Sequence, residues 1–77
     1  MRKMTMKIQT PSGFTALLRH TIHLTSDVHI LQDDSMVNGK ALLGLLSLDH
    51  DKELTVVTDA PEEEWMRFVQ DVQPLLT

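Results

Sequence analysis

The spacing of apolar residues changes several times along this chain, and no linker separates one spacing from the next. Apolar and polar residues alternate over 4–9 and again over 27–31, which is the period of a half-buried strand. Between these segments, the apolar residues of 14–24 fall on one helical stripe, with Arg19 and two histidines on the opposite face. The pattern predicts short strands and helices that pack directly on one another.

The rest of the chain continues this alternation. A turn at 32–35 and a short arm at 36–38 complete a hairpin, a helix of about two turns follows at 40–48, and the β-branched segment 54–58 is a strand. A last helix follows Pro61. Its expected buried stripe is Trp65, Phe68, Val69, Val72, Leu75 and Leu76. The predicted order is β-α-β-β-α-β-α.

The starts of the first and last predicted helices contain residues that commonly cap helices. Thr10 is a candidate N-cap, and Pro11 suits the first position of the helix that follows. For the last helix, Asp59 or Thr58 is the expected cap. Pro61 and three glutamates occupy its first turn, where the helix dipole favours negative charge.

Strands with one apolar face need one cover, and three amphipathic helices can supply it. The sequence therefore predicts an α+β fold, with a four-stranded antiparallel sheet and all three helices on one face. Its 77 residues suit a single domain spanning 1–77. A domain this small buries only about 60% of its unfolded surface, so each apolar face counts.

Composition excludes several classes of protein. The net charge of −4, with acids grouped in short runs, argues against binding to nucleic acid, which calls for a basic stripe. No apolar run approaches the roughly 18 residues of a membrane span, and the first ten residues contain no apolar segment of signal-peptide length. Cysteine is absent, which excludes disulfides and thiolate metal sites. We expect a cytoplasmic protein without cofactor.

The leucine-rich segment 42–48 is the most unusual local feature. A two-turn helix cannot bury all of its leucines, because they point in nearly all directions. Leu45 and Leu48 are expected to face the sheet. Leu42, Leu43 and Leu46 share another side and are expected to face water, around a glycine that exposes backbone between them. An exposed apolar patch of this kind favours a contact surface.

The four histidines suggest no catalytic or metal site. His20 and His23 lie three residues apart on one helix face, but no third ligand is evident nearby, so a solvated face is the preferred interpretation. His29 lies on the polar side of a strand. His50 lies in an acidic turn, and neither has a partner arrangement for catalysis. No metal site is predicted.

The segment "SDVHILQDDSMVNGKALLGLLSL", residues 26–48, resembles the central part of HPr, the histidine-containing phosphocarrier of the bacterial sugar phosphotransferase system, and of its regulatory paralogue Crh. The positions in step with the family's pattern are Val37, Asn38, Lys40, Gly44, Ser47 and Leu48. The resemblance implies the HPr-like open-faced β-sandwich, whose element order is the one predicted above.

The departures from the family pattern concern its chemistry. The family's active-site segment carries a histidine and an arginine at the start of the first helix, where this chain has "TPSGFTALL". Aligned without a gap, Thr10 stands at the histidine position and Ser12 at the arginine position; with a gap, the active loop is deleted. Ala41 stands at the regulatory serine position. The sequence therefore lacks both the histidine and the serine that are phosphorylated in the family.

The resemblance implies that the short leucine-rich helix, with the start of the first helix, is a docking face. Its candidate residues here are Leu42, Leu43, Leu46, Lys40 and Arg19. We therefore expect a regulatory or protein-interaction module that is not an enzyme. Its partner would be a phosphotransferase-system or catabolite-regulation protein, or a second copy. The alternative is a phosphocarrier or phosphoacceptor that uses a non-standard residue, such as Thr10, Ser12 or a histidine.

Overall fold

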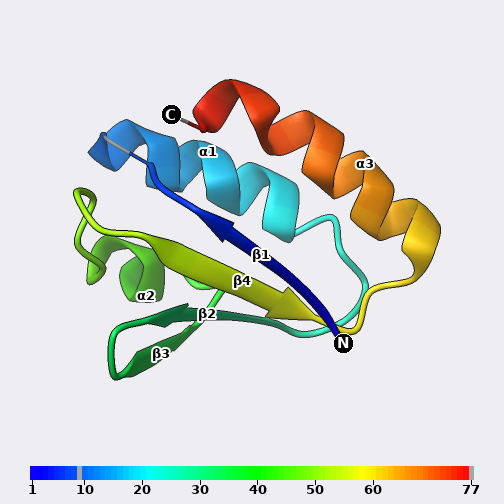
Figure 1. Cartoon of the computed structure of the whole chain (residues 1–77), viewed down its shortest axis with the longest axis horizontal. Helices are drawn as coiled ribbons and strands as arrows, with labels where there is room; N and C mark the ends of the chain where they lie inside the picture. The colour runs from blue at the N-terminus through cyan, green and yellow to red at the C-terminus, as the bar shows by residue number, and fades with distance from the viewer. Residues whose placement is uncertain (9, 77) are drawn as a thin grey trace.

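A computed structural model describes residues 1–8 and 10–76 of the chain. Within them, the elements follow the predicted order and end in a short 3-10 turn (Figure 1). Their bounds are β1 (Arg2–Met6), α1 (Pro11–Thr21), β2 (Val28–Gln32), β3 (Ser35–Asn38), α2 (Leu42–Leu46), β4 (Leu54–Thr58), α3 (Glu62–Val72) and η1 (Gln73–Leu75).

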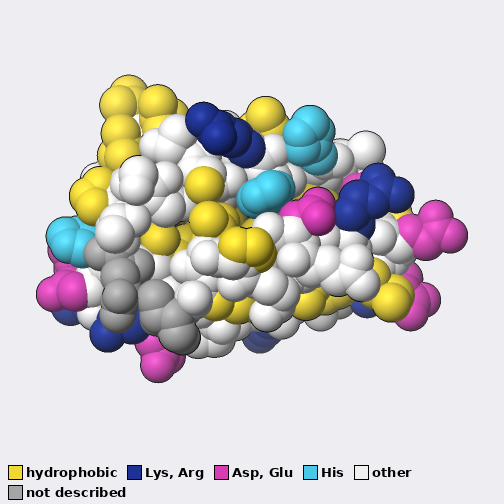
Figure 2. Space-filling model, turned by 90° about the horizontal axis from the view of Figure 1, so that it is seen from above, with side chains coloured by type: hydrophobic (Ala, Val, Ile, Leu, Met, Phe, Trp, Pro, Cys, Tyr) yellow, Lys and Arg dark blue, Asp and Glu magenta, His cyan; other side chains and the backbone are white. Residues whose placement is uncertain are grey.

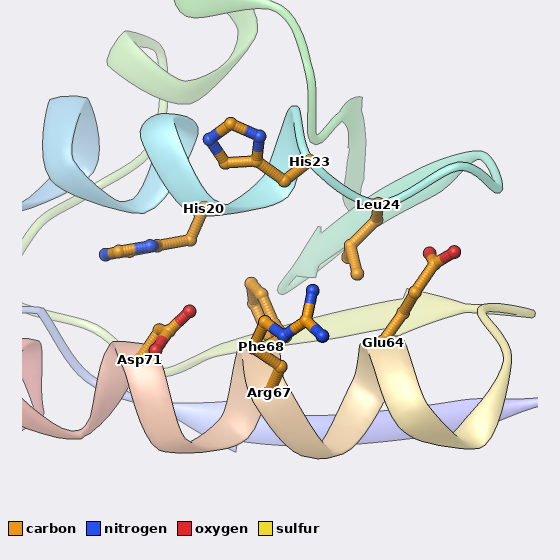
Figure 3. A pocket seen from close by; sticks show the side chains of 7 residues that line it. All are labelled: His20, His23, Leu24, Glu64, Arg67, Phe68 and Asp71. Carbon is orange, nitrogen blue, oxygen red and sulfur yellow. The ribbon is translucent and has the colours of Figure 1, made fainter.

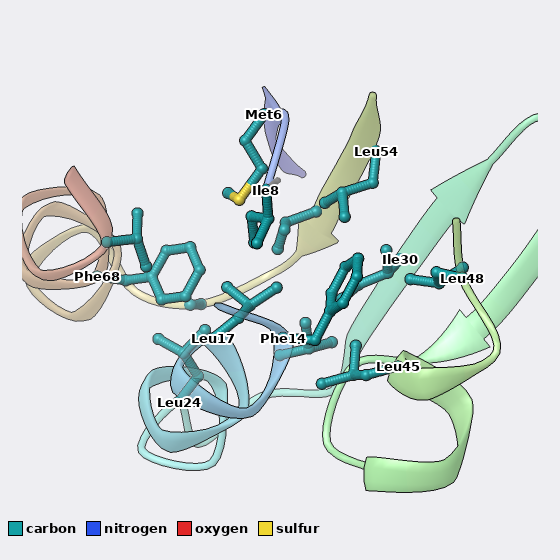
Figure 4. Packing of buried hydrophobic residues seen from close by; sticks show 14 residues of the cluster. Met6, Ile8, Phe14, Leu17, Leu24, Ile30, Leu45, Leu48, Leu54 and Phe68 are labelled. Atoms are coloured by element: carbon teal, nitrogen blue, oxygen red, sulfur yellow. The ribbon is translucent and has the colours of Figure 1, made fainter. Parts of the chain in front are cut away.

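The four strands form one antiparallel sheet in the order β1-β4-β2-β3. Its register places apolar residues opposite one another across the whole sheet: Met4 pairs with Val56, Val56 with Ile30, and Ile30 with Val37. The same face carries all three helices, as the end-on view shows (Figure 4). The predicted α+β fold, with an open antiparallel sheet and helices on one side, is confirmed.

The core lies between the sheet and the helices (Figure 4). Leu17 of α1 and Leu45 of α2 are both fully buried, and Phe68 brings α3 into the same cluster. Trp65 stacks on Phe68, with 5.4 Å between ring centroids, and is half-buried, as expected. Each helix therefore contributes its apolar side to one continuous cluster.

The first strand and helix differ slightly from the predicted ranges. The strand is Arg2–Met6 rather than 4–9, and Gln9 lies outside the described residues. Thr10 caps α1 as predicted, because its side-chain oxygen accepts from the backbone N–H of Gly13 at 3.3 Å. The helix ends at Thr21 rather than at residue 24, yet Leu24 is still buried.

The predicted cap of the last helix is wrong. Pro61 itself holds the N-cap position of α3, and no side chain caps the helix. Thr58 ends β4, where its hydroxyl donates to the carbonyl of Asp27, and Asp59 lies 3.8 Å from the terminal amine. The carbonyl of Pro61 accepts from Trp65, so the backbone alone starts this helix.

The end of the last helix also differs from the predicted one. The α-helix ends at Val72, and η1 contains Pro74, which lacks the N–H that a continuing helix needs. Leu75 and Leu76 of the expected stripe are half-buried, packed against the core from beyond the α-helix. Their packing against the core is confirmed, but they lie in and just after the 3-10 helix η1 and not in the α-helix.

Candidate functional site

The α2 helix presents three leucines to solvent. Leu42, Leu43 and Leu46 are 43%, 82% and 49% exposed, and we call them the leucine patch. Leu45 and Leu48 are buried, as predicted. The patch is therefore a surface feature of the folded chain and not part of its core.

Close backbone packing holds α2 in this position. A Cβ added to Gly44 would lie 3.3 Å from Cβ of Val37 and 3.4 Å from the carbonyl oxygen of Asn38. Gly44 is partly exposed, and the absence of a side chain also lets α2 approach β3 closely. At the preceding turn, Gly39 donates its N–H to the Val28 carbonyl at 2.7 Å.

The start of α2 is also fixed to the end of α1. The buried hydroxyl of Thr21 donates to the carbonyl of Gly39 at 2.6 Å. The next residue is Lys40, whose ammonium donates to the carbonyl of Leu24, three residues after the end of α1. These two contacts place the C-terminal end of α1 beside the N-terminal end of α2.

The two predicted cationic docking residues differ in their environment. Lys40 is half-buried and has a structural role at Leu24, which reduces its freedom to reach a partner. Arg19 is exposed in the last turn of α1 and forms no hydrogen bond or ion pair with any described residue. Figure 2 shows the surface of the molecule from above the view of Figure 1. Hydrophobic side chains gather at one end of this surface, with Lys or Arg and His side chains beside them.

The start of α1 carries hydroxyls and no imidazole. Thr10 and Ser12 are both exposed, and their side-chain oxygens lie 3.1 Å apart. They share a hollow of about 330 Å³ with apolar side chains from the chain's C-terminal segment, including Leu75 and Leu76. None of the described residues that line it is charged. An uncharged wall provides no counter-charge for a bound phosphate.

Both helical histidines line a second hollow, of about 240 Å³, between α1 and α3 (Figure 3). Two carboxylates that the sequence could not place nearby, Glu64 and Asp71, line it as well. Arg67 lines it as well, beside Phe68 in the view of Figure 3. Even so, no cluster of three metal-ligating side chains occurs within residues 1–8 and 10–76.

Glu64 joins α3 to the loop after α1. Its two carboxylate oxygens accept from the backbone N–H and the hydroxyl of Thr25, at 2.9 and 2.8 Å. The backbone hydrogen bond, followed by that from the hydroxyl, lowers the pKa of this carboxyl below its ordinary value. The sequence analysis missed this pair, because the two residues lie 39 positions apart and neither belongs to a motif.

The remaining singled-out residues lie apart from one another. Ala41 holds the N-cap position of α2 and offers no hydroxyl. His29 is exposed on the outer face of β2, and His50 is exposed in the turn after α2. The described part of the chain contains no helix long and apolar enough to cross a membrane.

Comparison with known proteins gives a clear result for structure and none for sequence. No protein-family model matches the chain, and no curated protein matches it by sequence. The histidine-containing phosphocarrier protein of Mycoplasma is similar in structure, with a TM-score of 0.77 and 14% identity over 99% of both chains.

Two Bacillus proteins are similar as well. The catabolite repression protein Crh of Bacillus subtilis has a TM-score of 0.64 and 22% identity, covering 96% of this chain and 88% of its own. The phosphocarrier protein HPr of Bacillus anthracis has a TM-score of 0.68 and 17% identity, covering 94% and 96%. The HPr-like fold inferred from residues 26–48 is therefore confirmed across nearly the whole chain.

Proposed function

We propose that this chain, which has the fold of HPr and Crh, is a non-catalytic interaction module related to the sugar phosphotransferase system. It binds a phosphotransferase-system or catabolite-regulation protein and carries no phosphoryl group. Its proposed docking residues are Leu42, Leu43 and Leu46, together with Arg19 and Lys40. The observation that carries the proposal is the exposure of these leucines, 43–82%, in a domain whose other α2 leucine is fully buried.

The start of α1 supports the first part of the proposal. A phosphocarrier needs a nucleophile from which the phosphoryl group can be passed on, next to positive charge. Thr10 and Ser12 supply hydroxyls, whose phosphoesters do not readily release the group, and no cationic side chain is among the described residues that line the hollow beside them. The nearest histidine along the chain, His20, belongs to the other end of the same helix.

The leucine patch supports the second part. A leucine that stays exposed to water, when it could be buried, forgoes about 1.5–3 kcal/mol of stabilising free energy. For a small domain this is a large share of the total stability. Arg19, exposed in the last turn of α1, has no partner among the described residues. Arginine and apolar anchors together are typical of interface hot spots.

A phosphotransfer assay tests the first part directly. The protein is incubated with enzyme I and phosphoenolpyruvate, with an HPr of standard active-site sequence as the positive control, and intact mass is measured. We expect no increase of about 80 Da, the mass of one phosphoryl group added by such chemistry. A stable increase that maps to Thr10, Ser12 or a histidine would establish the alternative, a phosphoacceptor with a non-standard residue.

A binding assay tests the second part. Enzyme I and the catabolite regulator are titrated into isotope-labelled protein, and amide shifts are recorded. Shifts centred on α2 and extending to α1, lost in Leu43→Glu, support the docking face. Shifts confined to the outer face of the sheet, or unchanged in Leu43→Glu, contradict it.

A further inference from the structure

We propose that the hollow between α1 and α3 binds a small zwitterion, an α-amino acid with an apolar side chain. Its volume of about 240 Å³ lies below the roughly 300–1,000 Å³ of pockets for drug-sized ligands, so its ligand is small. No residue of α2 is among the described residues that line it. The inference therefore goes beyond the proposed function and does not depend on it.

The walls of the hollow come from two parts of the chain that are distant in sequence. His20 of α1 and His23, just after this helix, line one side (Figure 3). Arg67 and Asp71 of α3 line the other (Figure 3). Because Arg67 and Asp71 lie four positions apart on a helix, they share one side of α3.

Arg67 and Asp71 are not paired with one another or with other residues. Both are exposed, and neither side chain forms a hydrogen bond or ion pair with a described residue. Their order on the helix, cation before anion, is the less favourable one for an ion pair at this spacing. The remaining carboxylate of the lining, Glu64, already accepts two hydrogen bonds from Thr25. The hollow therefore offers one guanidinium and one carboxylate to a ligand.

These two charges select the class of ligand. A simple anion such as phosphate would pair with Arg67 but would also face the carboxylates of Glu64 and Asp71. A simple cation would pair with Asp71 but would face Arg67. An α-amino acid carries a carboxylate, which accepts two hydrogen bonds from a guanidinium, and an ammonium, which donates to a carboxylate. A zwitterion is thus the class that satisfies both groups at once.

Apolar side chains complete the lining. Leu24 and Phe68 are only 4% and 3% exposed, so they form the inner wall of the hollow. An apolar side chain of the ligand that lies against them is removed from water, which favours binding. The imidazoles of His20 and His23 can each donate or accept a hydrogen bond beside this wall. L-Valine has both required parts, a zwitterionic head and a small apolar side chain, and is the probe.

Titration of the isotope-labelled protein with L-valine, followed by amide and imidazole chemical shifts, tests the inference in the absence of any partner protein. We expect saturable shifts of the residues that line the hollow. Two analogues are matched controls: 3-methylbutanoate lacks the amine of valine, and isobutylamine lacks its carboxylate. Each should bind about tenfold more weakly than valine, because the hydrogen bonds of one charged group are lost. Inorganic phosphate should cause no saturable shift.

Variants assign each charged group of the ligand to its side chain. Arg67→Gln should weaken valine binding about tenfold without weakening that of isobutylamine, and Asp71→Asn should weaken it about tenfold without weakening that of 3-methylbutanoate. Lys3→Gln and Glu63→Gln are the controls, because these exposed residues carry one charge of each sign and lie outside the lining. Both should bind valine as the wild type does. Thermal melting verifies that all four variants fold.

Three results would overturn the inference. They are the absence of saturable shifts with valine, an analogue or phosphate that binds as tightly as valine, and valine binding that Arg67→Gln and Asp71→Asn weaken no more than the control variants do. Each of them leaves the docking of a partner on α2 to be judged by its own titration. Conversely, valine binding that follows the expected pattern stands even if neither enzyme I nor the catabolite regulator binds α2.

Discussion

Leu43 and Leu45 are two positions apart on α2, yet Leu43 is 82% exposed and Leu45 is fully buried. A helix turns about 100° per residue, so two positions place side chains on nearly opposite sides. Leu45 points into the core shared by α1 and the sheet (Figure 4), whereas Leu43 lies on the solvent-exposed side of α2. The same residue type thus serves packing and surface within one turn.

This relationship predicts opposite responses to truncation. Leu45→Ala should lower the free energy of unfolding by about 2–5 kcal/mol, because it removes a buried side chain and leaves a cavity. Leu43→Ala should change it by no more than about 0.5 kcal/mol. Urea denaturation measures both. Leu43→Glu should likewise leave the fold intact, whereas Leu45→Glu should unfold it; equal losses would place the patch in the core and contradict the docking proposal.

The sequence was sufficient to predict which leucines of α2 are buried and which are exposed, because helical spacing fixes which of them share a side. It could not give the role of Gly44, which depends on how closely β3 approaches from a different part of the chain. Sequence spacing describes one element at a time, whereas close backbone contacts between elements appear only after they have packed.

The turn before α2 gives a second prediction. A Cβ at Gly39 would lie 2.5 Å from Cγ1 of Val28 and 3.2 Å from its carbonyl oxygen. Gly39→Ala should therefore destabilise the protein by about 1–3 kcal/mol, the usual cost of overpacking. In Gly44→Ala the nearest contacts are 3.3 and 3.4 Å, and a gain in helix propensity of about 1 kcal/mol opposes them. Thermal melting should show a clearly larger loss for Gly39→Ala. Equal losses would mean that the Val28 contact relaxes freely.

The start of α1 gives a third prediction, which separates capping from anion binding. Thr10→Ala should cost about 1 kcal/mol of stability, because Gly13 loses the side-chain acceptor of its N–H. Ser12→Ala should cost less, since its hydroxyl contacts only Thr10 among the described residues. Calorimetric titration with inorganic phosphate should show no binding to the wild-type protein. Binding that Thr10→Ala removes would instead support an anion site and the phosphoacceptor alternative.

The caps illustrate what local sequence can and cannot predict. Thr10 was identifiable because an N-cap threonine before proline is a local pattern, and the structure confirms it. The same reasoning failed for α3, where Thr58 was already committed to the carbonyl of Asp27, 31 residues away. A polar side chain has several possible partners, and tertiary structure decides between them. The link from Glu64 to Thr25 was out of reach for the same reason.

That link gives the last prediction, which concerns pH. The Thr25 hydrogen bonds lower the pKa of the Glu64 carboxyl in the folded chain, so the folded state favours the ionised form. Its stabilising contribution is therefore fully present above the ordinary glutamate pKa of about 4.3 and is lost as the pH falls through the depressed folded value. Glu64→Gln should lower the melting temperature at pH 7, because one acceptor and the charge are lost. It should also flatten the decline in stability below about pH 4.5, within the carboxylate range.

Glu63→Gln is the matched control, because this neighbouring exposed glutamate accepts no hydrogen bond from a described residue. Glu63→Gln removes the same charge from the first turn of α3 and leaves the hydrogen bonds between Glu64 and Thr25 in place. Melting temperatures recorded between pH 3 and pH 7 should therefore fall further below the wild type for Glu64→Gln than for Glu63→Gln at neutral pH, and should converge with the wild type in acid. If the two variants follow the same curve, the helix dipole and not the Thr25 contact accounts for the effect of charge at the start of α3.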